Sequence, residues 1–138
     1  MPYMKAELSR KSPYWLNKYR YYELKYYCLQ YPEWKRAYSM SYPKPMNTMA
    51  NSTRIKQDYK RSVEDLAIYR ASLKRNIDLI DRVASMTDAE ISDYILMAVT
   101  ENTPYKTLKL VYGLPCGPDM FYDRCRKFYR LLSQEKGL

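Results

Sequence analysis

The sequence predicts an all-α protein, with tyrosine-rich N-terminal helices, one long central helix and a C-terminal helix-turn-helix. First, apolar residues recur at spacings of three and four over most of the chain, which is the period of a helix buried on one side. Second, long stretches contain no helix breaker, because the only glycines among the 138 residues are Gly113, Gly117 and Gly137. The length and the 46% of hydrophobic residues suit one domain, or one small domain with an accessory helical region.

The first predicted region, residues 1–50, holds two helices and a linker. Ser12-Pro13 is typical of an N-cap followed by proline at the first helical position. About eighteen residues then run without a breaker, which is too long for a typical strand. Helical spacings join their apolar residues Trp15, Tyr19, Tyr22, Tyr26 and Leu29. Pro32 starts a shorter helix with Trp34 and Tyr38 on one side, and residues 41–52 read as a linker.

Tyrosine and lysine are dense together in this first region, and two interpretations follow. The rings and the lysines would form a surface for nucleic acid, with stacking from the former and charge from the latter. Alternatively, the tyrosines form the edge of a core while Lys18, Arg20 and Lys25 face water. The sequence favours the second interpretation, and phosphate contacts by some of these basic residues are compatible with either.

The second region, residues 51–86, is predicted to be one long helix. Asn51, Ser52 and Thr53 offer N-cap residues for it. Its apolar stripe, with Ile68 on the shoulder, consists of Ile55, Tyr59, Val63, Leu66, Tyr69, Leu73, Ile77, Ile80 and Ala84. About thirty residues make a helix of about 45 Å, which a small C-terminal domain cannot bury alone. The helix must pack on the N-terminal helices, on a second copy of itself, or on both, so a monomeric hairpin and a homodimer both remain open.

The third region, residues 87–138, is predicted to be the helix-turn-helix domain. Thr87 and Glu90 match a capping box at the start of one helix. A short helix over residues 105–112 follows, and Gly113 ends it. The residues expected to face inward are Ile91, Tyr94, Ile95 and Val99 in the first helix, and Leu108, Val111 and Tyr112 in the second.

The last helix begins near Pro118 and is amphipathic. Its inner face is expected to consist of Phe121, Cys125, Phe128 and Leu132. The opposite face carries Asp119, Asp123, Arg126 and Arg130, with Tyr122 and Lys127 on its shoulders. A short helix, a glycine-marked turn and an amphipathic helix with a basic outer face make a helix-turn-helix. The turn is longer than the three or four residues of the compact motif, and the alternative is an ordinary helical hairpin with a solvated charged face.

The net charge of +9 is unevenly distributed along the chain. Residues 1–60 carry a net +8, residues 61–103 a net −3, and residues 104–138 a net +4. Two basic ends therefore flank an acidic middle. Basic surface favours phosphate backbones through counterion release, although a charge of this size also serves solubility.

The composition argues against an enzyme, a cofactor and a metal site. The chain has no histidine, which excludes Ser-His-Asp, Cys-His and histidine–metal chemistry. Cys28, Cys116 and Cys125 are unclustered and too few for a structural zinc site, so we expect free thiols in a reducing compartment. No apolar run is long enough to span a membrane, and the N-terminus lacks a secretory signal. We therefore expect a cytoplasmic protein.

Two blocks of the sequence resemble a known family. YKTLKLVYGLPCGPDMFYDRCRKFYRLLS, which starts at Tyr105, resembles the C-terminal half of phage-encoded regulators of the ArpU and RinA type. YWLNKYRYYELKYYCLQYPEW, which starts at Tyr14, resembles the N-terminus of related prophage proteins from Gram-positive gut bacteria. The resemblance implies a small phage transcription regulator with a helix-turn-helix like the promoter-reading domain of sigma factors. It also implies a location at the nucleoid of a bacterial host cell. Pro118 and Cys125 stand where the family has polar or basic residues.

The sequence thus predicts a phage or prophage regulator that binds double-stranded DNA and has no enzymatic activity, cofactor or metal. The helix from Pro118 would enter the major groove, while the helix over 105–112 braces the backbone. The predicted DNA-binding residues are Lys106, Lys109, Asp119, Tyr122, Asp123, Arg126, Lys127 and Arg130. Two other functions remain open: a protein-interaction factor that binds RNA polymerase or a host defence complex, and a DNA-packaging adaptor.

Overall fold

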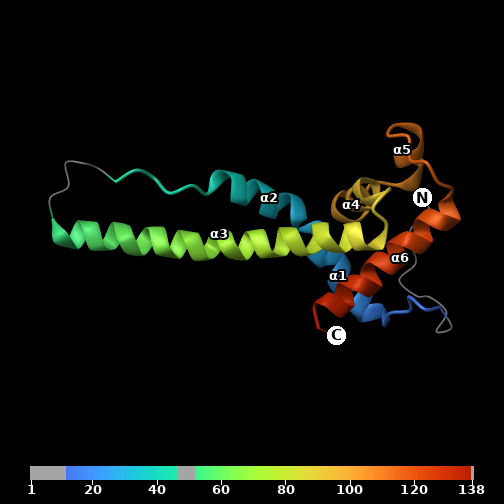
Figure 1. Cartoon of the computed structure of the whole chain (residues 1–138), viewed down its shortest axis with the longest axis horizontal. Helices are drawn as coiled ribbons and strands as arrows, with labels where there is room; N and C mark the ends of the chain where they lie inside the picture. The colour runs from blue at the N-terminus through green and yellow to red at the C-terminus, as the bar shows by residue number, and fades with distance from the viewer. Residues whose placement is uncertain (1–11, 47–51, 138) are drawn as a thin grey trace.

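The computed structural model describes residues 12–46 and 52–137, and within them the chain forms helices and no strand. The predicted all-α class is therefore confirmed (Figure 1). The helices are α1 (Lys18–Leu29), α2 (Tyr31–Met40), α3 (Thr53–Thr87), α4 (Ser92–Glu101), α5 (Tyr105–Leu110) and α6 (Pro118–Glu135).

The first helix starts later than the sequence predicts. The N-cap of α1 is Asn17, whose side chain accepts a hydrogen bond of 2.9 Å from the N–H of Tyr19. Ser12 instead closes a turn ahead of the helix, where its hydroxyl oxygen accepts from the N–H of Tyr14 at 3.2 Å. The Ser12-Pro13 prediction of a helix start is therefore wrong, because serine satisfies a turn as well as it satisfies a helix end.

The buried face of α1 is not the one that the apolar stripe indicates. Tyr21, Leu24 and Cys28 are buried, whereas Tyr19 and Tyr26 of the stripe are exposed. Spacing finds the helix here but not its inner side, because tyrosines occur all around it. A tyrosine has an apolar ring and a polar tip, so its position in a stripe does not determine its burial.

Helices α2 and α3 pack side by side and run in opposite directions (Figure 1). The hydroxyl of Tyr31, at the start of α2, donates to Asp81 near the end of α3 at 2.5 Å. Near the other end of α2, Nη1 of Arg70 donates to the carbonyl oxygens of Tyr38 and Ser41, at 2.6 and 2.8 Å. The N-terminal helices thus cover one side of α3, as the hairpin alternative requires.

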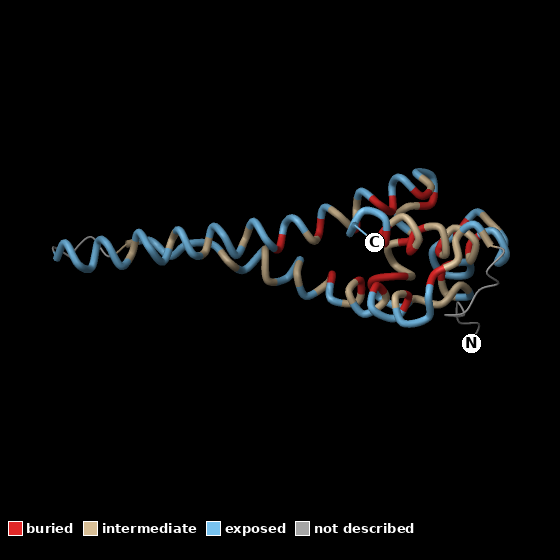
Figure 2. Tube along the Cα trace, turned by 90° about the horizontal axis from the view of Figure 1, so that it is seen from below, coloured by how far each residue is buried: buried red, intermediate tan, exposed pale blue. Residues whose placement is uncertain are grey.

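The long helix divides into two halves that differ in burial. In the half that includes Leu73, Ile77 and Ile80, the stripe lies in the core. In the half before it, Ile55 and Tyr69 each expose 49% of their surface. We call the compact part the head. It consists of α1, α4, α5, α6 and residues 73–87 of α3. We call the projecting part the arm, which consists of residues 53–72 of α3 and the extended segment 41–46 beside them. Figure 2 shows that the buried positions gather in the head.

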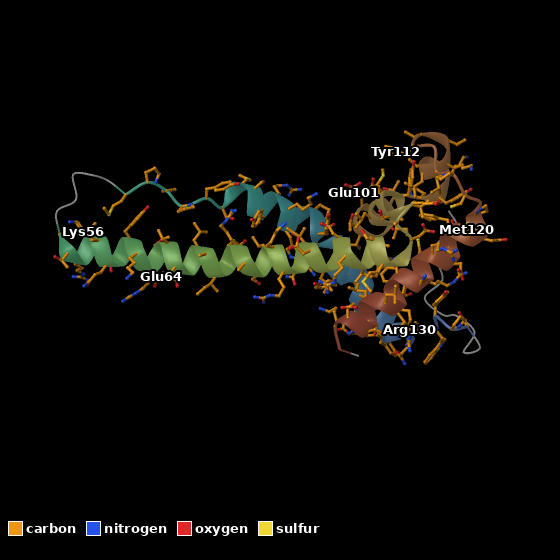
Figure 3. All side chains as sticks on the ribbon, viewed as in Figure 1. Lys56, Glu64, Glu101, Tyr112, Met120 and Arg130 are labelled. Atoms are coloured by element: carbon orange, nitrogen blue, oxygen red, sulfur yellow. The ribbon has the colours of Figure 1, made fainter. Side chains whose placement is uncertain are left out.

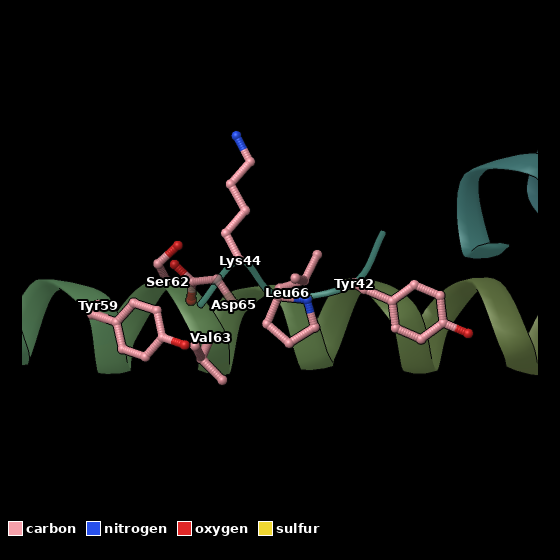
Figure 4. A pocket seen from close by; sticks show the side chains of 8 residues that line it. Tyr42, Lys44, Tyr59, Ser62, Val63, Asp65 and Leu66 are labelled. Carbon is pink, nitrogen blue, oxygen red and sulfur yellow. The ribbon is translucent and has the colours of Figure 1, made fainter. Parts of the chain in front are cut away.

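The arm contains an open hollow of about 600 Å³ between the extended segment and α3. Apolar and charged side chains line it together, and Figure 4 shows Lys44 pointing away from the helix. The lining residues are Tyr42, Pro43, Lys44, Tyr59, Ser62, Val63, Asp65 and Leu66. The apolar stripe of the arm is therefore only partly covered by residues of its own chain.

The predicted capping box at Thr87 is wrong. Thr87 is the last residue of α3, and its hydroxyl donates to the carbonyl of Val83 at 2.7 Å. Asp88 instead accepts from the N–H of Glu90 at 3.1 Å, and α4 begins only at Ser92. The buried face of α3 therefore continues to Thr87, which the sequence analysis takes as the start of the next helix.

One core joins the three predicted regions in the head. Tyr21 of α1 meets Tyr129 of α6 edge-on, with 5.1 Å between the ring centroids. Residues of every helix contribute, and those less than 2% exposed include Leu24, Ile80, Ile95, Leu108, Phe121 and Phe128. The helix-turn-helix region is therefore built into the same core as α1 and the end of α3.

Candidate nucleic-acid interface

The connection from α5 to α6 is long but well packed. Gly113 has a φ of 73°, a conformation that favours glycine, and it turns the chain out of α5. Leu114 then points back into the core, and its N–H donates to the carbonyl of Leu108 at 3.0 Å. Gly117 is the N-cap of α6 and Pro118 its first residue, as the sequence predicts for a proline-started helix.

The short helix α5 ends earlier than predicted. It runs from Tyr105 to Leu110, and only Leu108 of its three expected inward residues is buried. Val111 and Tyr112 lie in the turn with 69% and 51% of their surfaces exposed, so their predicted inward orientation is wrong. Val111 is the C-cap, and its N–H still donates to the carbonyl of Thr107 at 2.9 Å, so the chain leaves the helix only between Val111 and the positive φ of Gly113.

Side chains of α5 hold this connection in place. Nζ of Lys109 donates to the carbonyl of Leu114 at 3.0 Å and lies 3.5 Å from that of Cys116. The hydroxyl of Tyr105 donates to the same Cys116 carbonyl at 3.0 Å. The predicted phosphate ligand Lys109 therefore already has a role in the turn, while Lys106 is exposed on the outside of α5.

The inner face of α6 is the one that the sequence predicts. Phe121, Cys125, Phe128 and Leu132 are all buried, and Tyr129 joins them. Burial raises the pKa of the Cys125 thiol to about 12. A neutral, buried thiol acts as a small apolar group, so Cys125 belongs to the packing of α6.

The first turns of α6 place three predicted site residues in different surroundings. Asp119 is exposed at the tip of the helix. The ring of Tyr122 packs near that of Tyr105, with 6.1 Å between centroids, and burial raises the pKa of its hydroxyl. Asp123 pairs with Arg124 at 2.9 Å, and Arg124 also pairs with Asp88 at 3.2 Å. The carboxylate of Asp123 therefore supports the join between α6 and the end of α3.

Three predicted basic residues, Arg126, Lys127 and Arg130, follow one another along α6 and are half-buried. Nη1 of Arg130 donates to the carbonyl of Trp15 at 3.3 Å, just before α1. Figure 3 labels Arg130 near the lower end of the head, where the N-terminal segment passes α6. All residues from 121 to 133 are buried or half-buried, so only the ends of the long side chains of this part of α6 reach the solvent.

The start of α1 adds basic residues that the site prediction did not include. Nε of Arg20 donates to Oγ of Ser133 at 3.2 Å, which holds α1 against the last turns of α6. Lys18, two residues earlier in α1, is exposed. The structure thus places one basic residue of α1, Arg20, against α6. Other contributors to the net +8 of residues 1–60 do not lie beside α6, because Lys44, Arg54, Lys56 and Lys60 are on the arm.

An apolar surface lies beside the basic one. Leu110, Val111 and Tyr112 at the end of α5 are exposed, and so is Met120 in the first turn of α6. Figure 3 shows Tyr112 and Met120 at the periphery of the head. The turn therefore presents apolar side chains that the predicted site does not include.

The three cysteines are free thiols, and among the described residues no histidine, cysteine or acid cluster could hold a metal ion. None of the helices in the described part of the chain combines the length and the apolarity that crossing a membrane requires. Comparison with protein-family models, with curated proteins and with solved structures found no match.

Proposed function

We propose that this protein binds double-stranded DNA through α5 and α6, and that it regulates phage or prophage transcription. The observation that supports this most is the row of half-buried basic residues Arg126, Lys127 and Arg130 along α6, whose inner side is fixed in the core. Lysine and arginine that neutralise phosphates release counterions, which favours binding to a duplex. The regulatory role rests on the resemblance to ArpU- and RinA-type regulators.

Within this proposal the residues of α6 and α5 have unequal roles. Arg126 and Lys127 make no ion pair with the described residues and extend from a helix fixed on its inner side, so they are the first candidates for contacts in the major groove. Lys106 is the candidate phosphate contact on α5. Lys109 holds the turn, Asp123 supports the end of α3 through Arg124, and Arg130 holds the segment before α1. Loss of any of the three would change DNA binding by altering the shape of the site.

The test measures binding to a promoter-containing duplex over a series of salt concentrations. We expect Arg126→Ala combined with Lys127→Ala to weaken binding and to reduce the salt slope by about 0.9 for each phosphate that is no longer neutralised. The matched control is Arg61→Ala combined with Arg75→Ala, which removes the same charge from exposed positions on α3. Equal binding by both double variants would show that α6 does not contact the duplex.

A second candidate function is a protein-interaction factor, favoured by the exposed apolar residues of the turn. Leu110 and Val111 lie on the surface without a covering partner among the described residues. Exposed apolar groups that gather at one place commonly mark contacts with another protein. Leu110→Asp, which leaves every basic residue in place, would then abolish capture of RNA polymerase while leaving duplex binding unchanged.

A further inference from the structure

We propose that the outer face of α1 binds single-stranded nucleic acid, with bases stacked on Tyr19, Tyr22 and Tyr26 and phosphates contacted by Lys18 and Lys25. We call the three tyrosines the tyrosine face. This inference goes beyond duplex binding by α6, because it concerns another helix face, another form of nucleic acid and another type of contact.

The tyrosine face is a row of exposed rings on one side of a helix. Tyr19, Tyr22 and Tyr26 expose 77%, 36% and 61% of their surfaces. Their spacings of three and four residues align them along α1, and the rings of Tyr22 and Tyr26 are near-parallel, with centroids 6.5 Å and planes 24° apart. Seven residues of helix span about 10 Å, which is about three base spacings of 3.4 Å in a nucleic-acid strand.

The other side of α1 fixes these rings in place. Tyr21, Leu24 and Cys28 lie in the core of the head. Tyr21 packs edge-on against Tyr129 of α6, and it also touches the ring of Tyr22 with 5.4 Å between centroids. Exposing large rings on a packed helix brings no folding stability, but it provides flat surfaces that need little ordering when a planar ligand binds.

Charge identifies the class of ligand. Lys18 and Lys25 are seven residues apart, so they lie along the same side of α1 as Tyr22. Glu23, the acidic residue of this helix, pairs with Nη1 of Arg20 at 3.0 Å, which offsets its charge. A row of rings beside a row of lysines matches a strand whose bases are flat and whose backbone is anionic. A duplex does not match, because its bases already stack on one another and present only their edges.

The experiment uses the full chain and fluorescence anisotropy with labelled oligonucleotides of dT and of dA, alongside a duplex of equal length. Stacking on a ring is worth about 1–3 kcal/mol per base, so we expect Tyr19→Ala combined with Tyr26→Ala to weaken single-strand binding about tenfold or more. Tyr19→Phe with Tyr26→Phe keeps the rings and should bind like the parent. The matched control, Tyr42→Ala with Tyr69→Ala, removes two exposed rings of the arm and should also leave binding unchanged.

A second pair tests the lysines. Lys18→Ala with Lys25→Ala should reduce the salt slope of single-strand binding by about 1.4, which is two phosphates at about 0.7 each. Failure of the parent to bind either oligonucleotide, or equal affinity of the parent and the Tyr19→Ala, Tyr26→Ala variant, would overturn the proposal and leave the face to a protein partner. Duplex binding and its loss in Arg126→Ala, Lys127→Ala are read in the same assay, so the two proposals succeed or fail separately. Thermal unfolding should be unchanged in the Tyr19, Tyr26 variants, because both side chains are exposed.

Discussion

The two halves of α3 belong to one helix and one apolar stripe, yet they have different surroundings. Ile77 and Ile80 are buried in the head, where α3 packs with α2, α4 and α6, whereas Ile55 lies half-exposed on the arm. The sequence pattern is the same in both halves, since the spacings of three and four continue without a break. The difference teaches that periodicity identifies the face a helix would bury, while the arrangement of its neighbours decides how much of that face is covered.

The largest expected effect is alkaline unfolding of the head. Burial raises the pKa of Tyr21 to about 12 and that of Cys125 to about 12, from ordinary values of 10.0 and 9.0. Burial, reinforced by the hydrogen bond to Asp81, also raises the pKa of Tyr31. Because these pKa values are higher in the folded state, the stabilisation is complete below the unfolded values and disappears as the pH rises through the folded ones. Urea unfolding should show constant stability up to about pH 8.5 and a steady fall between about pH 9 and 12.

The thiol part of this effect can be separated from the tyrosine part. In Cys125→Ala the fall between about pH 9 and 10 should become shallower rather than vanish, because burial also raises the pKa of the Cys28 thiol, which still titrates before the tyrosines in the unfolded chain. Constant stability up to pH 12 would contradict the burial of these groups.

The next effect compares one substitution in the two halves of α3. Ile80 is fully buried, so Ile80→Ala removes its packing and leaves a cavity, at a cost of about 2–5 kcal/mol. Ile55→Ala makes the same chemical change at a half-exposed position and should cost less than about 1 kcal/mol. Chemical denaturation of both variants checks this, and similar costs would mean that the arm is covered in solution by a partner, such as a second copy.

The smallest effect is local and concerns Arg70, where the arm meets α2. Its guanidinium lies over the rings of Tyr38 and Tyr42, 4.0 and 4.4 Å from their centroids, and donates to two carbonyls of the chain between them. Hydrogen bonds from a charged donor contribute about 1.5–3 kcal/mol. Arg70→Lys keeps the charge but not the planar fork, so it should not restore these interactions.

Hydrogen exchange gives the readout for Arg70. Amides of residues 38–46 should exchange faster in both Arg70→Lys and Arg70→Ala, while those of α4 and α6 stay protected. Uniform loss of protection across the head would show that Arg70 supports the whole fold rather than the arm.

Much of the fold could be predicted from the sequence. The order of the helices, the long α3 and the inner face of α6 follow from spacing and from the positions of glycine and proline. Three details could not be predicted, and each has a physical reason. Tyrosine is stable both in water and in the core, so the apolar stripe did not identify the buried face of α1. Ser12 and Thr87 can form hydrogen bonds in turns, at N-caps and inside helices, so neither of them marked a helix start. The turn at Gly113 ended α5 earlier than the sequence predicts.

The candidate site was less predictable than the fold. Lys109, Asp123 and Arg130 were predicted as DNA contacts from their residue type and helical position, but a sequence pattern does not show that they bond to Leu114, Arg124 and Trp15 in the folded chain. The contribution of Arg20 was missed for the same reason, since its partner Ser133 lies more than a hundred residues away. Local patterns carry no information about contacts of that separation.

That separation also sets an order of events during synthesis. Helices α2 and α3 are neighbours in sequence and can pair as soon as both have left the ribosome. Helix α1 cannot complete the packing of Tyr21 until α6 has been made, because that ring meets Tyr129, and the nearby contacts of Trp15 and Arg20 span 115 and 113 residues. Closing so long a loop is slow, and the unpaired inner faces of α1 and α6 are exposed until it closes. We therefore expect the head to become native last, whereas α2 and α3 can pack together before the head forms.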